Sequence, residues 1–448
     1  MAGEWRMTNL ADVCDRVSVG YVGPTSEYFC ESSEGVRMLR SQNVRPGRME
    51  LNDVKYVRTE FHKKNKKSQL KAGDILFVRV GQNRGDCCIV PEGVGELNCA
   101  NIVFARPRRA LGAFLGFYFR SLVGQQQLRS ISTGSAQGVL NTGAIASLMV
   151  PIPTDDEAQA IAAMLGALDD KIELNRRMNA TLEAMARALF QSWFVDFDPV
   201  RATQEGRKPT GMDDATAALF PESFGESELG HIPTGWRVGR VAEVSDFSHS
   251  SINPAEFPEE TFDHYSLPAF DEGRTPKTEP GSAIMSNKLV VTRNSVLLSK
   301  LNPHTPRVWL PDLHKTRRSA CSTEFIVAST RSGFSCEFIF SLFTSAAFAT
   351  TYGTLVTGTT GSHQRIRPES VLEMNTIIPP PKMVEAFTTI SQPMFDKINR
   401  NIDQSRTLAT LRDTLLPKLL SGELSVMEEE RQIERATSWK PQLTPPTS

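Results

Sequence analysis

Residues 161–193 read IAAMLGALDDKIELNRRMNATLEAMARALFQSW, and this stretch decides the fold. Apolar and asparagine side chains recur in it at spacings that alternate between four and three residues, which is the pattern of a coiled-coil seam. We expect one helix from about Asp156 to Phe197, about 60 Å long at roughly 1.5 Å per residue. The predicted seam consists of Ile161, Leu165, Leu168, Ile172, Asn175, Asn179, Leu182, Ala186, Leu189 and Trp193.

A second, weaker seam follows 226 residues later in the chain. Because proline breaks a helix interior, Pro393 predicts that the second continuous helix begins near that residue. A helix of this length is too long to lie against one small domain, so we expect the two helices to pack on each other, antiparallel. The second seam consists of Phe387, Ser391, Met394, Ile398, Asn401, Ser405, Leu408, Arg412, Leu415 and Leu419.

Two asparagines, Asn175 and Asn401, occupy equivalent positions in the two predicted seams. A buried asparagine can fix the register of a coiled coil at some cost in stability. The alternative is that both side chains point to solvent beside the seam, and the sequence leaves this choice open.

The rest of the chain also repeats itself. Six matches follow in the same order with offsets of 221–231 residues, which predicts a duplication. We therefore expect an α+β protein with two tandem mixed α/β domains separated by two long helices that form an antiparallel coiled coil. The matches are Trp5-Arg6 and LADVCD (10–15) with Trp236-Arg237 and VAEVSD (241–246), DILFVRV (74–80) with SVLLSKL (295–301), FLGFYFRS (114–121) with FIFSLFTS (338–345), the polar stretches STGSAQ (132–137) with TGTTGSHQ (357–364), VPIP (150–153) with IPPP (378–381), and DKIxxN at 170–175 and 396–401.

The repeat predicts six segments along the chain. Residues 1–153 and 236–381 are the two globular domains, and 154–198 and 382–426 are the spacer helices that follow them. Residues 199–235 are predicted to be a surface linker with one short helix near Asp213 to Leu219, because the segment is rich in proline, glycine and acidic residues. Residues 427–448 are predicted to be a flexible tail.

Composition favours a soluble protein with a hydrophobic core. The chain has 448 residues, of which 40% are hydrophobic and 23% charged. The polar N-terminus predicts no signal peptide. The uncharged window from Phe338 to Ser362 turns rich in Ser, Thr and Gly, so we expect a buried helix and a loop and no membrane partner. The seven cysteines show no CxxC spacing, which favours a reduced, cytoplasmic protein without structural zinc.

The net charge of −1 hides a local imbalance. Residues 1–150 carry 20 Lys/Arg against 13 Asp/Glu, whereas residues 155–230 carry 7 against 15. This difference predicts that different surfaces meet different partners. A further basic group, Lys300, Arg307, Lys315, Arg317 and Arg318, suits phosphate binding, although an ordinary solvated face would have the same composition.

Catalytic motifs are absent from the sequence. We find no GxxxxGK[ST] phosphate loop, no GxGxxG, no NPPY-like methyltransferase motif and no HExxH zinc motif. The acidic cluster at 155–157 is interpreted as a helix cap, because acidic side chains favour the first turn. We therefore predict no catalytic residue and no bound metal or cofactor for this chain.

Polar loops instead suggest recognition of nucleic acid. Gln and Asn can bond bidentately to adenine and Arg to guanine, whereas a lysine run suits contacts with phosphates. An ordinary polar turn remains the alternative for each loop. The candidate DNA-binding residues are Lys63, Lys64, Lys66, Lys67, Gln82, Asn83, Arg84, Ser135, Gln137, Lys300, Asn302, His304, Ser362, His363, Gln364, Arg365 and Arg367.

Four stretches together resemble the specificity (S) subunit of type I restriction–modification systems. They are LDDKIELNRRMNATLEAMARALFQSWFVDFDPVRA (168–202), GMDDATAALFPESF (211–224), ELGHIPTGW (228–236) and LRDTLLPKLLSGEL (411–424). The likeness extends over nearly the whole chain in order.

The resemblance implies two target-recognition domains, each reading one half of a split double-stranded DNA site. It also implies docking of two methyltransferase subunits, which use S-adenosylmethionine, and of restriction subunits, which use ATP and Mg²⁺. The expected function is thus a non-enzymatic DNA-recognition scaffold with an asymmetric target. The alternative is a protein–protein adaptor that uses the coiled coil without reading DNA sequence. A nuclease would need a metal-binding carboxylate cluster, which the sequence does not show.

Overall fold

The computed structural model of the protein describes residues 5–81, 83–108, 110–133, 139–313, 316–356 and 364–426. The chain divides into two compact units. Unit 1 comprises Met1–Glu173 with Ser405–Ser448, and unit 2 comprises Leu174–Gln404. Each unit contains one globular domain and a part of each long helix, and the six-segment division given above stays a prediction.

Unit 1 contains a four-stranded sheet, a five-stranded sheet and a short terminal strand pair. The four-stranded sheet has the order β10-β9-β12-β2, and the five-stranded sheet has the order β3-β7-β4-β11-β8. The strands are β1 (Arg6–Asn9), β2 (Cys14–Val19), β3 (Phe29–Cys30), β4 (Gly35–Leu39), β5 (Val44–Arg45), β6 (Arg48–Met49), β7 (Lys55–Arg58), β8 (Gln69–Leu70), β9 (Ile75–Val78), β10 (Cys87–Ile89), β11 (Leu97–Cys99), β12 (Ile102–Pro107) and β13 (Met149–Ile152). The helices are α1 (Thr59–Lys64), α2 (Gly112–Arg120), α3 (Leu122–Thr133) and α4 (Thr142–Ala146).

Strand β9 explains the layering of unit 1. It is buried along its whole length, because both faces of the four-stranded sheet are covered. Alternate side chains point to opposite faces. Ile75 and Phe77 belong to the core that contains α2, whereas Leu76 and Val78 pack with residues of the five-stranded sheet. The sheet therefore lies between a helical layer and the second sheet.

Unit 2 repeats this plan. Its four-stranded sheet has the order β17-β25-β22-β23, and its five-stranded sheet has the order β18-β21-β24-β19-β20. The strands are β14 (Phe224–Gly225), β15 (Ile232–Pro233), β16 (Arg237–Arg240), β17 (Ser245–Ser248), β18 (Ser251–Ile252), β19 (Thr261–Tyr265), β20 (Lys277–Pro280), β21 (Lys288–Val291), β22 (Ser295–Ser299), β23 (Val308–Trp309), β24 (Arg318–Cys321), β25 (Phe325–Thr330) and β26 (Asn375–Ile378). The helices are α6 (Asp198–Gln204), α7 (Asp214–Ala217), α8 (Val241–Val244), α9 (Leu267–Asp271), α10 (Cys336–Thr344), α11 (Ala346–Thr354) and α12 (Pro368–Leu372).

The two sheets correspond strand by strand between the units, which confirms the predicted fold class. Strands β10, β9, β12 and β2 match β23, β22, β25 and β17, and the terminal pair β1–β13 matches β16–β26. Each five-stranded sheet has one parallel pair, β4–β11 in unit 1 and β19–β24 in unit 2. Only the fifth strand differs, because β3 extends the sheet beside β7 whereas β18 extends it at the opposite edge, beside β21.

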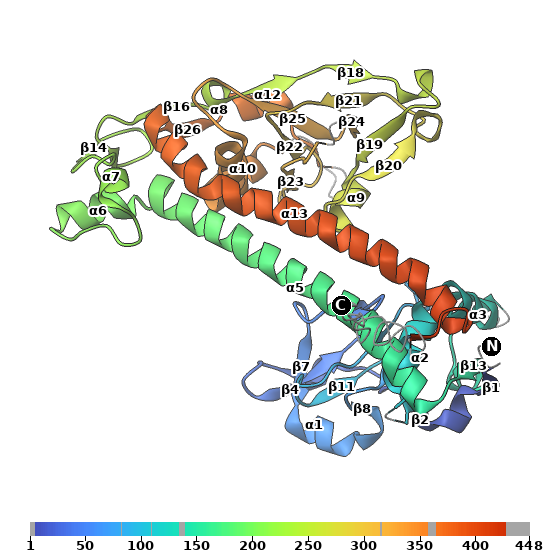
Figure 1. The fold of residues 1–448 in the computed structure, drawn as a ribbon. Coiled ribbons are helices and arrows are strands. Elements are labelled where there is room, and N and C mark those ends of the chain that lie inside the picture. The colour runs from blue at the N-terminus through green and yellow to red at the C-terminus, as the bar shows by residue number, and fades with distance from the viewer. Residues whose placement is uncertain are drawn as a thin grey trace, which may run out of the picture. The chain divides into compact units, whose positions relative to one another are not determined.

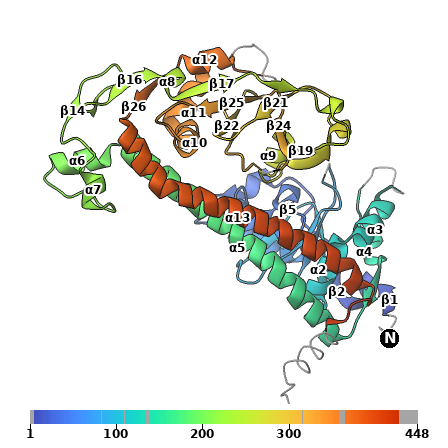
Figure 2. The same cartoon turned by 45° about the horizontal axis from the view of Figure 1, so that its top comes forward.

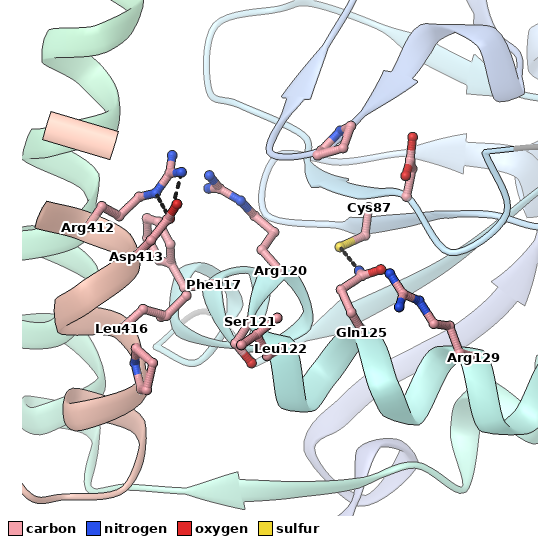
Figure 3. Close-up of a pocket in the computed structure, with 13 residues that line it drawn as sticks. Cys87, Phe117, Arg120, Ser121, Leu122, Gln125, Arg129, Arg412, Asp413 and Leu416 are labelled. Atoms are coloured by element: carbon pink, nitrogen blue, oxygen red, sulfur yellow. Dashed lines mark hydrogen bonds and ion pairs between the residues drawn. The ribbon is translucent and has the colours of Figure 1, made fainter. Parts of the chain in front are cut away.

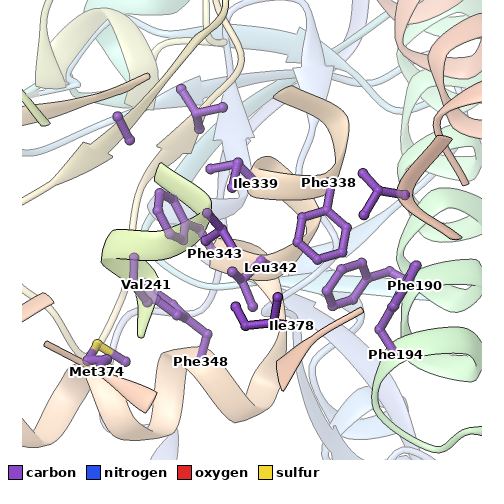
Figure 4. Packing of buried hydrophobic residues seen from close by; sticks show 14 of the residues in the cluster. Phe190, Phe194, Val241, Phe338, Ile339, Leu342, Phe343, Phe348, Met374 and Ile378 are labelled. Atoms are coloured by element: carbon purple, nitrogen blue, oxygen red, sulfur yellow. The ribbon is translucent and has the colours of Figure 1, made fainter. Parts of the chain in front are cut away.

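The core of unit 2 includes the segment between the two copies. Phe190 and Phe194 of the first long helix contact Phe338 of α10, with ring centroids 5.5 and 5.2 Å apart (Figure 4). Val200 and Phe220, from the predicted linker, are buried in the same cluster. The predicted short helix is present as α7, but the prediction of a purely surface linker is wrong, because its apolar side chains complete this core.

The two long helices are α5 (Asp155–Phe194) and α13 (Pro381–Leu420). Both are unbroken ribbons (Figures 1 and 2). Helix α5 ends three residues before the predicted Phe197, which has a left-handed φ of 56° and precedes the new helix α6. In unit 2, the C-terminal part of α5 packs antiparallel to the N-terminal part of α13. In unit 1 the remaining parts pack together, with Leu165 and Leu419 in one core.

The predicted start of the second helix near Pro393 is wrong. Helix α13 begins at Pro381, where proline is tolerated in the first turn, and continues through Pro393. An interior proline costs about 3 kcal/mol. Phe387 before it and Phe395 after it are both buried in hydrophobic clusters of unit 2, and this packing outweighs the local penalty.

The uncharged window predicted to be a buried helix forms the two short helices α10 and α11. Ser345 separates them, and its hydroxyl caps α11 by accepting a hydrogen bond from the Phe348 N–H. Within the described parts of the chain, no helix is both long and apolar enough to cross a membrane.

Candidate nucleic-acid interface and helix pair

In unit 2 the structure joins two loops that are distant in sequence. The Asn302 N–H donates to the Gln364 carbonyl at 3.2 Å, and the Ile366 N–H donates to the Lys300 carbonyl at 3.2 Å. Leu301 and Arg365 thereby form an isolated antiparallel bridge. Asn302 adopts a left-handed φ of 55°, a conformation that asparagine tolerates better than most residues. The loop after β22 is therefore held against the segment that precedes α12.

Helix α11 anchors the start of the loop that follows β22. The buried Tyr352 hydroxyl donates to the Ser299 carbonyl, the last residue of β22, at 2.8 Å. Burial raises the pKa of Tyr352, so the hydroxyl stays a donor. The loop after β22 therefore starts from a fixed point.

The side chains of this loop pair form a polar, largely exposed surface. Asn302, His304, Arg365 and Arg367 are exposed, and Lys300 and Gln364 are half-buried. The guanidinium of Arg365 pairs with the Glu324 carboxylate at 2.7 Å, which orients it without burying it. Amide and guanidinium groups of this kind can bond to base edges or phosphates.

Unit 1 repeats one hydrogen bond of this junction at the equivalent place. The Leu140 N–H donates to the Arg79 carbonyl at 3.1 Å, which matches the bond from Ile366 to Lys300 in unit 2. The loop after β9 is a compact turn, closed by a hydrogen bond from the Gly85 N–H to the Val78 carbonyl at 3.0 Å. Asn83 and Arg84 are exposed on this turn.

Five predicted DNA-binding residues lie outside the described residues. They are Gln82, Ser135, Gln137, Ser362 and His363. The role of every candidate DNA-binding residue stays a prediction.

The four lysines of the predicted basic run in unit 1 do not lie on the loop after β9. Lys63 and Lys64 end helix α1, and Lys66 and Lys67 lie on the 3-10 turn that follows, all four exposed. Cations at a helix C-terminus are favoured by the helix dipole, so this position also has a structural explanation. The preceding His62 is buried, with its Nδ1 3.3 Å from Nδ2 of Asn98, and does not belong to the exposed run.

Three arginines of the second basic group are held in ion pairs with carboxylates. Arg307 binds Asp271 bidentately at 2.7 and 3.0 Å. Arg317 bonds to the buried Asp263 at 2.9 Å, and Arg318 pairs with Glu260. These ion pairs connect segments that are distant in the sequence of unit 2, which favours a structural role. Lys315 lies outside the described residues.

The acidic cluster at the start of α5 caps the helix. The Thr154 N–H donates to the Glu157 carboxylate at 3.0 Å, and the Glu157 N–H donates to the Thr154 hydroxyl at 3.3 Å. This reciprocal arrangement is a capping box. No group of three or more His, Cys, Asp or Glu residues arranged to hold a metal occurs among the residues that the structure describes.

Asparagines connect the two long helices within unit 2. Asn175 Nδ2 donates to the Gln404 side chain at 3.0 Å and to the Asn401 carbonyl at 3.4 Å. Asn401 Nδ2 donates in turn to Asn179 Oδ1 at 2.8 Å. Asn175 and Asn401 are each 1% exposed, so both lie within the helix pair instead of pointing to solvent.

The other predicted seam residues are buried to different degrees. Some larger buried side chains, Phe190 and Leu416, lie one position from the predicted stripe, because an α-helix drifts by about 20° per heptad relative to a 3.5-residue repeat. The spacing missed them for this reason. Ile161, Leu165 and Ile398 are buried, and Leu168, Ile172, Leu182, Leu189, Met394, Leu408 and Leu415 are half-buried.

In unit 1 a charged network joins the helix pair to α2. Asp169 of α5 accepts from Arg120 of α2 at 2.5 Å and from Arg412 of α13 at 2.6 Å. Arg412 also bonds to Asp413, as Figure 3 shows. A cavity of about 550 Å³ opens beside it, lined by Asp86, Gln125 and Arg129 among others. Carboxylates already neutralise Arg120 and Arg412, so we do not assign this cavity to DNA.

Comparison with known proteins agrees with this architecture. Residues 3–184 match the family described as the type I restriction modification DNA specificity domain. The MjaIX specificity subunit of a type I restriction enzyme from Methanocaldococcus jannaschii is 26% identical over 327 residues, which cover 70% of this chain and 69% of that protein. The HindI specificity subunit from Haemophilus influenzae is 23% identical over 410 residues, 80% of this chain and 88% of that protein.

A solved structure shows the same fold. The S subunit of a type I restriction–modification system from M. genitalium aligns over 93% of this chain and 96% of that chain, with a TM-score of 0.52 and 12% identity. Sequence and fold thus agree with the two repeated domains and the long helices described above. Residues 3–184 thus match the type I restriction modification DNA specificity domain, and the chain as a whole is similar to type I restriction–modification specificity subunits.

Proposed function

We propose that this chain reads one bipartite, asymmetric double-stranded DNA site, each globular domain reading one half. We further propose that it docks two methyltransferase subunits and, through them, the restriction subunits. The carrying observation is the repeated loop junction, in which Arg79 meets Leu140 and Lys300 meets Ile366. One backbone hydrogen bond of this junction recurs at the equivalent place in both copies, whereas the side chains beside it differ. Two such junctions support recognition of two different half-sites.

The proposal leaves the chemistry to the partner subunits. We expect S-adenosylmethionine to bind to the methyltransferase subunits and ATP and Mg²⁺ to be used by the partners, with no cofactor in this chain. The alternative, an adaptor that does not read DNA sequence, predicts equal affinity of the assembly for all duplexes.

Selective binding separates the two possibilities. The chain, assembled with its methyltransferase subunits, is titrated with a random duplex library at several salt concentrations, and the bound sequences are read. We expect enrichment of a two-part site and an affinity that falls with salt, because phosphate contacts release counterions. An unenriched pool would support the adaptor.

A pair of variants tests the assignment of the loops. Asn302→Ala is expected to relax specificity at one half-site, at a cost of about 1–3 kcal/mol for a lost base contact. The control Arg293→Ala removes an exposed arginine at the other end of β22 and should leave the selected site unchanged. If both variants select the wild-type site, Asn302 does not read a base.

A further inference from the structure

The two long helices are identical at few aligned positions, so the identical positions indicate which residues both copies need. Aligned with an offset of 226, residues 155–194 and 381–420 are identical at eight of 40 positions. Most of the shared residues pack in the helix pair or the cores. The eight pairs are Ala160/Ala386, Asp170/Asp396, Lys171/Lys397, Ile172/Ile398, Asn175/Asn401, Thr181/Thr407, Leu182/Leu408 and Leu189/Leu415.

One shared pair of residues is charged and faces away from the seam. Asp170 and Asp396 are exposed, as is Lys397, and Lys171 is half-buried. An aspartate two residues before a seam isoleucine lies about 160° from it around the helix, because each residue turns the helix by about 100°. Each aspartate therefore lies on the outer face of its helix, and each lysine, about 100° from the seam isoleucine, lies at the flank of the helix.

Helix stability does not explain why this pair recurs. Stabilising ion pairs within a helix join residues three or four positions apart. Four residues after Asp396 stands Arg400, but four residues after Asp170 stands Leu174. Four residues after each lysine stands a buried asparagine of the seam. Within the described parts of the chain, none of these four side chains forms an ion pair, in contrast to Asp169, which binds two arginines.

Neighbouring exposed positions show how freely the helix surfaces have diverged. Arg187 is exposed on α5, and its counterpart on α13 is Asp413, of opposite charge. An exposed position can therefore reverse its charge between copies without disturbing the fold, whereas the Asp–Lys pair is the same in both. A shared external partner accounts for that difference.

We propose that Asp170-Lys171 and Asp396-Lys397 are two equivalent docking points for two copies of the same methyltransferase subunit. This inference rests on the proposed function, because it assumes that such subunits bind to this chain. The partner surface carries a cation opposite each aspartate and an anion opposite each lysine. Two identical partner subunits require the same contact twice, whereas reading two different half-sites requires the loops to differ.

Exchanging the charges of one pair at a time tests the proposal. The variants are Asp170→Lys with Lys171→Asp, and Asp396→Lys with Lys397→Asp. Native mass spectrometry measures how many methyltransferase subunits bind to the full chain, and a titration measures the affinity. We expect two subunits on the wild-type chain, one on either exchange variant at the same concentration, and at least a tenfold loss of affinity at the altered point. The four-residue exchange should bind none.

The matched control is Arg187→Asp, which places the residue of the second copy at the same position of the first. It changes an exposed charge on α5 by two units and should leave two subunits bound. The milder variants Asp170→Asn and Asp396→Asn, checked by circular dichroism, replace any exchange variant that fails to fold, and each should weaken binding by about threefold or more.

The two possible failures are distinguishable. If the wild-type chain binds no methyltransferase subunit, the proposed function fails. If the wild type binds two and the four-residue exchange also binds two with unchanged affinity, the proposed function survives and the docking points lie elsewhere. An equal loss with Arg187→Asp would also overturn the assignment, because it would show a nonspecific effect of charge.

Discussion

Replacing Asp169 by alanine should destabilise unit 1 far more than the same change at Asp413. Both carboxylates bond to Arg412, at 2.6 and 2.8 Å respectively. Asp169 also binds Arg120, and its side chain is 25% exposed, against 64% for Asp413. The two positions thus form a matched pair in which chiefly burial and the number of partners differ.

The size of the effect follows from the desolvation of the arginines. The side chains of Arg120 and Arg412 are 17% and 19% exposed, so removing Asp169 leaves two largely buried guanidinium groups without their shared carboxylate. Breaking a fully buried pair costs about 3–5 kcal/mol. Because this network keeps some solvent contact, we expect a loss of about 2–3 kcal/mol. An exposed pair contributes about 0–1 kcal/mol, which sets the expectation for Asp413→Ala.

Hydrogen exchange with mass spectrometry suits this measurement, because the chain has two units and one global unfolding free energy would mix them. Peptides from α2 and from the C-terminal part of α13 should exchange faster in Asp169→Ala, by roughly thirtyfold for 2 kcal/mol. Peptides from unit 2 serve as an internal reference and should not change. If both variants changed the exchange rates equally, or if exchange became faster only in unit 2, the ion-pair network would not be what stabilises the contact between α2 and the helix pair.

Three further predictions concern the helix pair and the cores. Inserting four residues after Ala180 lengthens the helix by about 6 Å, so the unread gap selected from a duplex library should change by about two base pairs or binding should be lost. Asn401→Leu removes the 2.8 Å bond to Asn179 and should lower the local unfolding free energy of the helix pair in unit 2 by about 1–2 kcal/mol, measured by hydrogen exchange in unit 2 peptides of α5 and α13; slower exchange would count against a structural role. Burial raises the pKa of Cys87 to about 12, from an ordinary value of 9.0. Only the unfolded chain then loses this proton just above pH 9.0, so stability should fall as pH rises, and iodoacetamide should label Cys87 at pH 8.5 only after unfolding.

The fold was predictable because the two copies of a duplicated unit carry the same hydrophobic pattern. The buried runs DILFVRV and SVLLSKL became β9 and β22, the central strands of equivalent sheets. The seam spacing likewise predicted two long helices, since a period of four and three residues identifies one helix face. The pattern did not reveal that β3 and β18 lie on opposite edges, because such short strands carry almost no periodicity.

The errors came from local rules that distant contacts override. Proline breaks an isolated helix, but α13 continues through Pro393 because Phe387 and Phe395, on either side of it, are buried in the clusters of unit 2. The network of Asp169 with Arg120 and Arg412 joins residues 49 and 243 positions apart, and no spacing in the sequence connects them. The candidate loops could be located by their polar composition, but the backbone bond between Ile366 and Lys300 joins residues 66 positions apart, and composition does not indicate such a contact.

The segment between the copies shows that the two domains are not completed in the same way. In unit 2, Val238 packs against the core that buries Phe220 and Ile232 of that segment. Its counterpart in unit 1, Met7, is 47% exposed, and it lines a cavity of about 490 Å³ together with Leu122. A fragment that starts at residue 236 would therefore uncover apolar surface in unit 2. The fragment that keeps unit 2 intact must begin within α5, because Phe190 and Phe194 belong to the same core as Trp236. The helix and the linker are thus structural parts of the second domain, and the repeat boundary in the sequence is not its folding boundary.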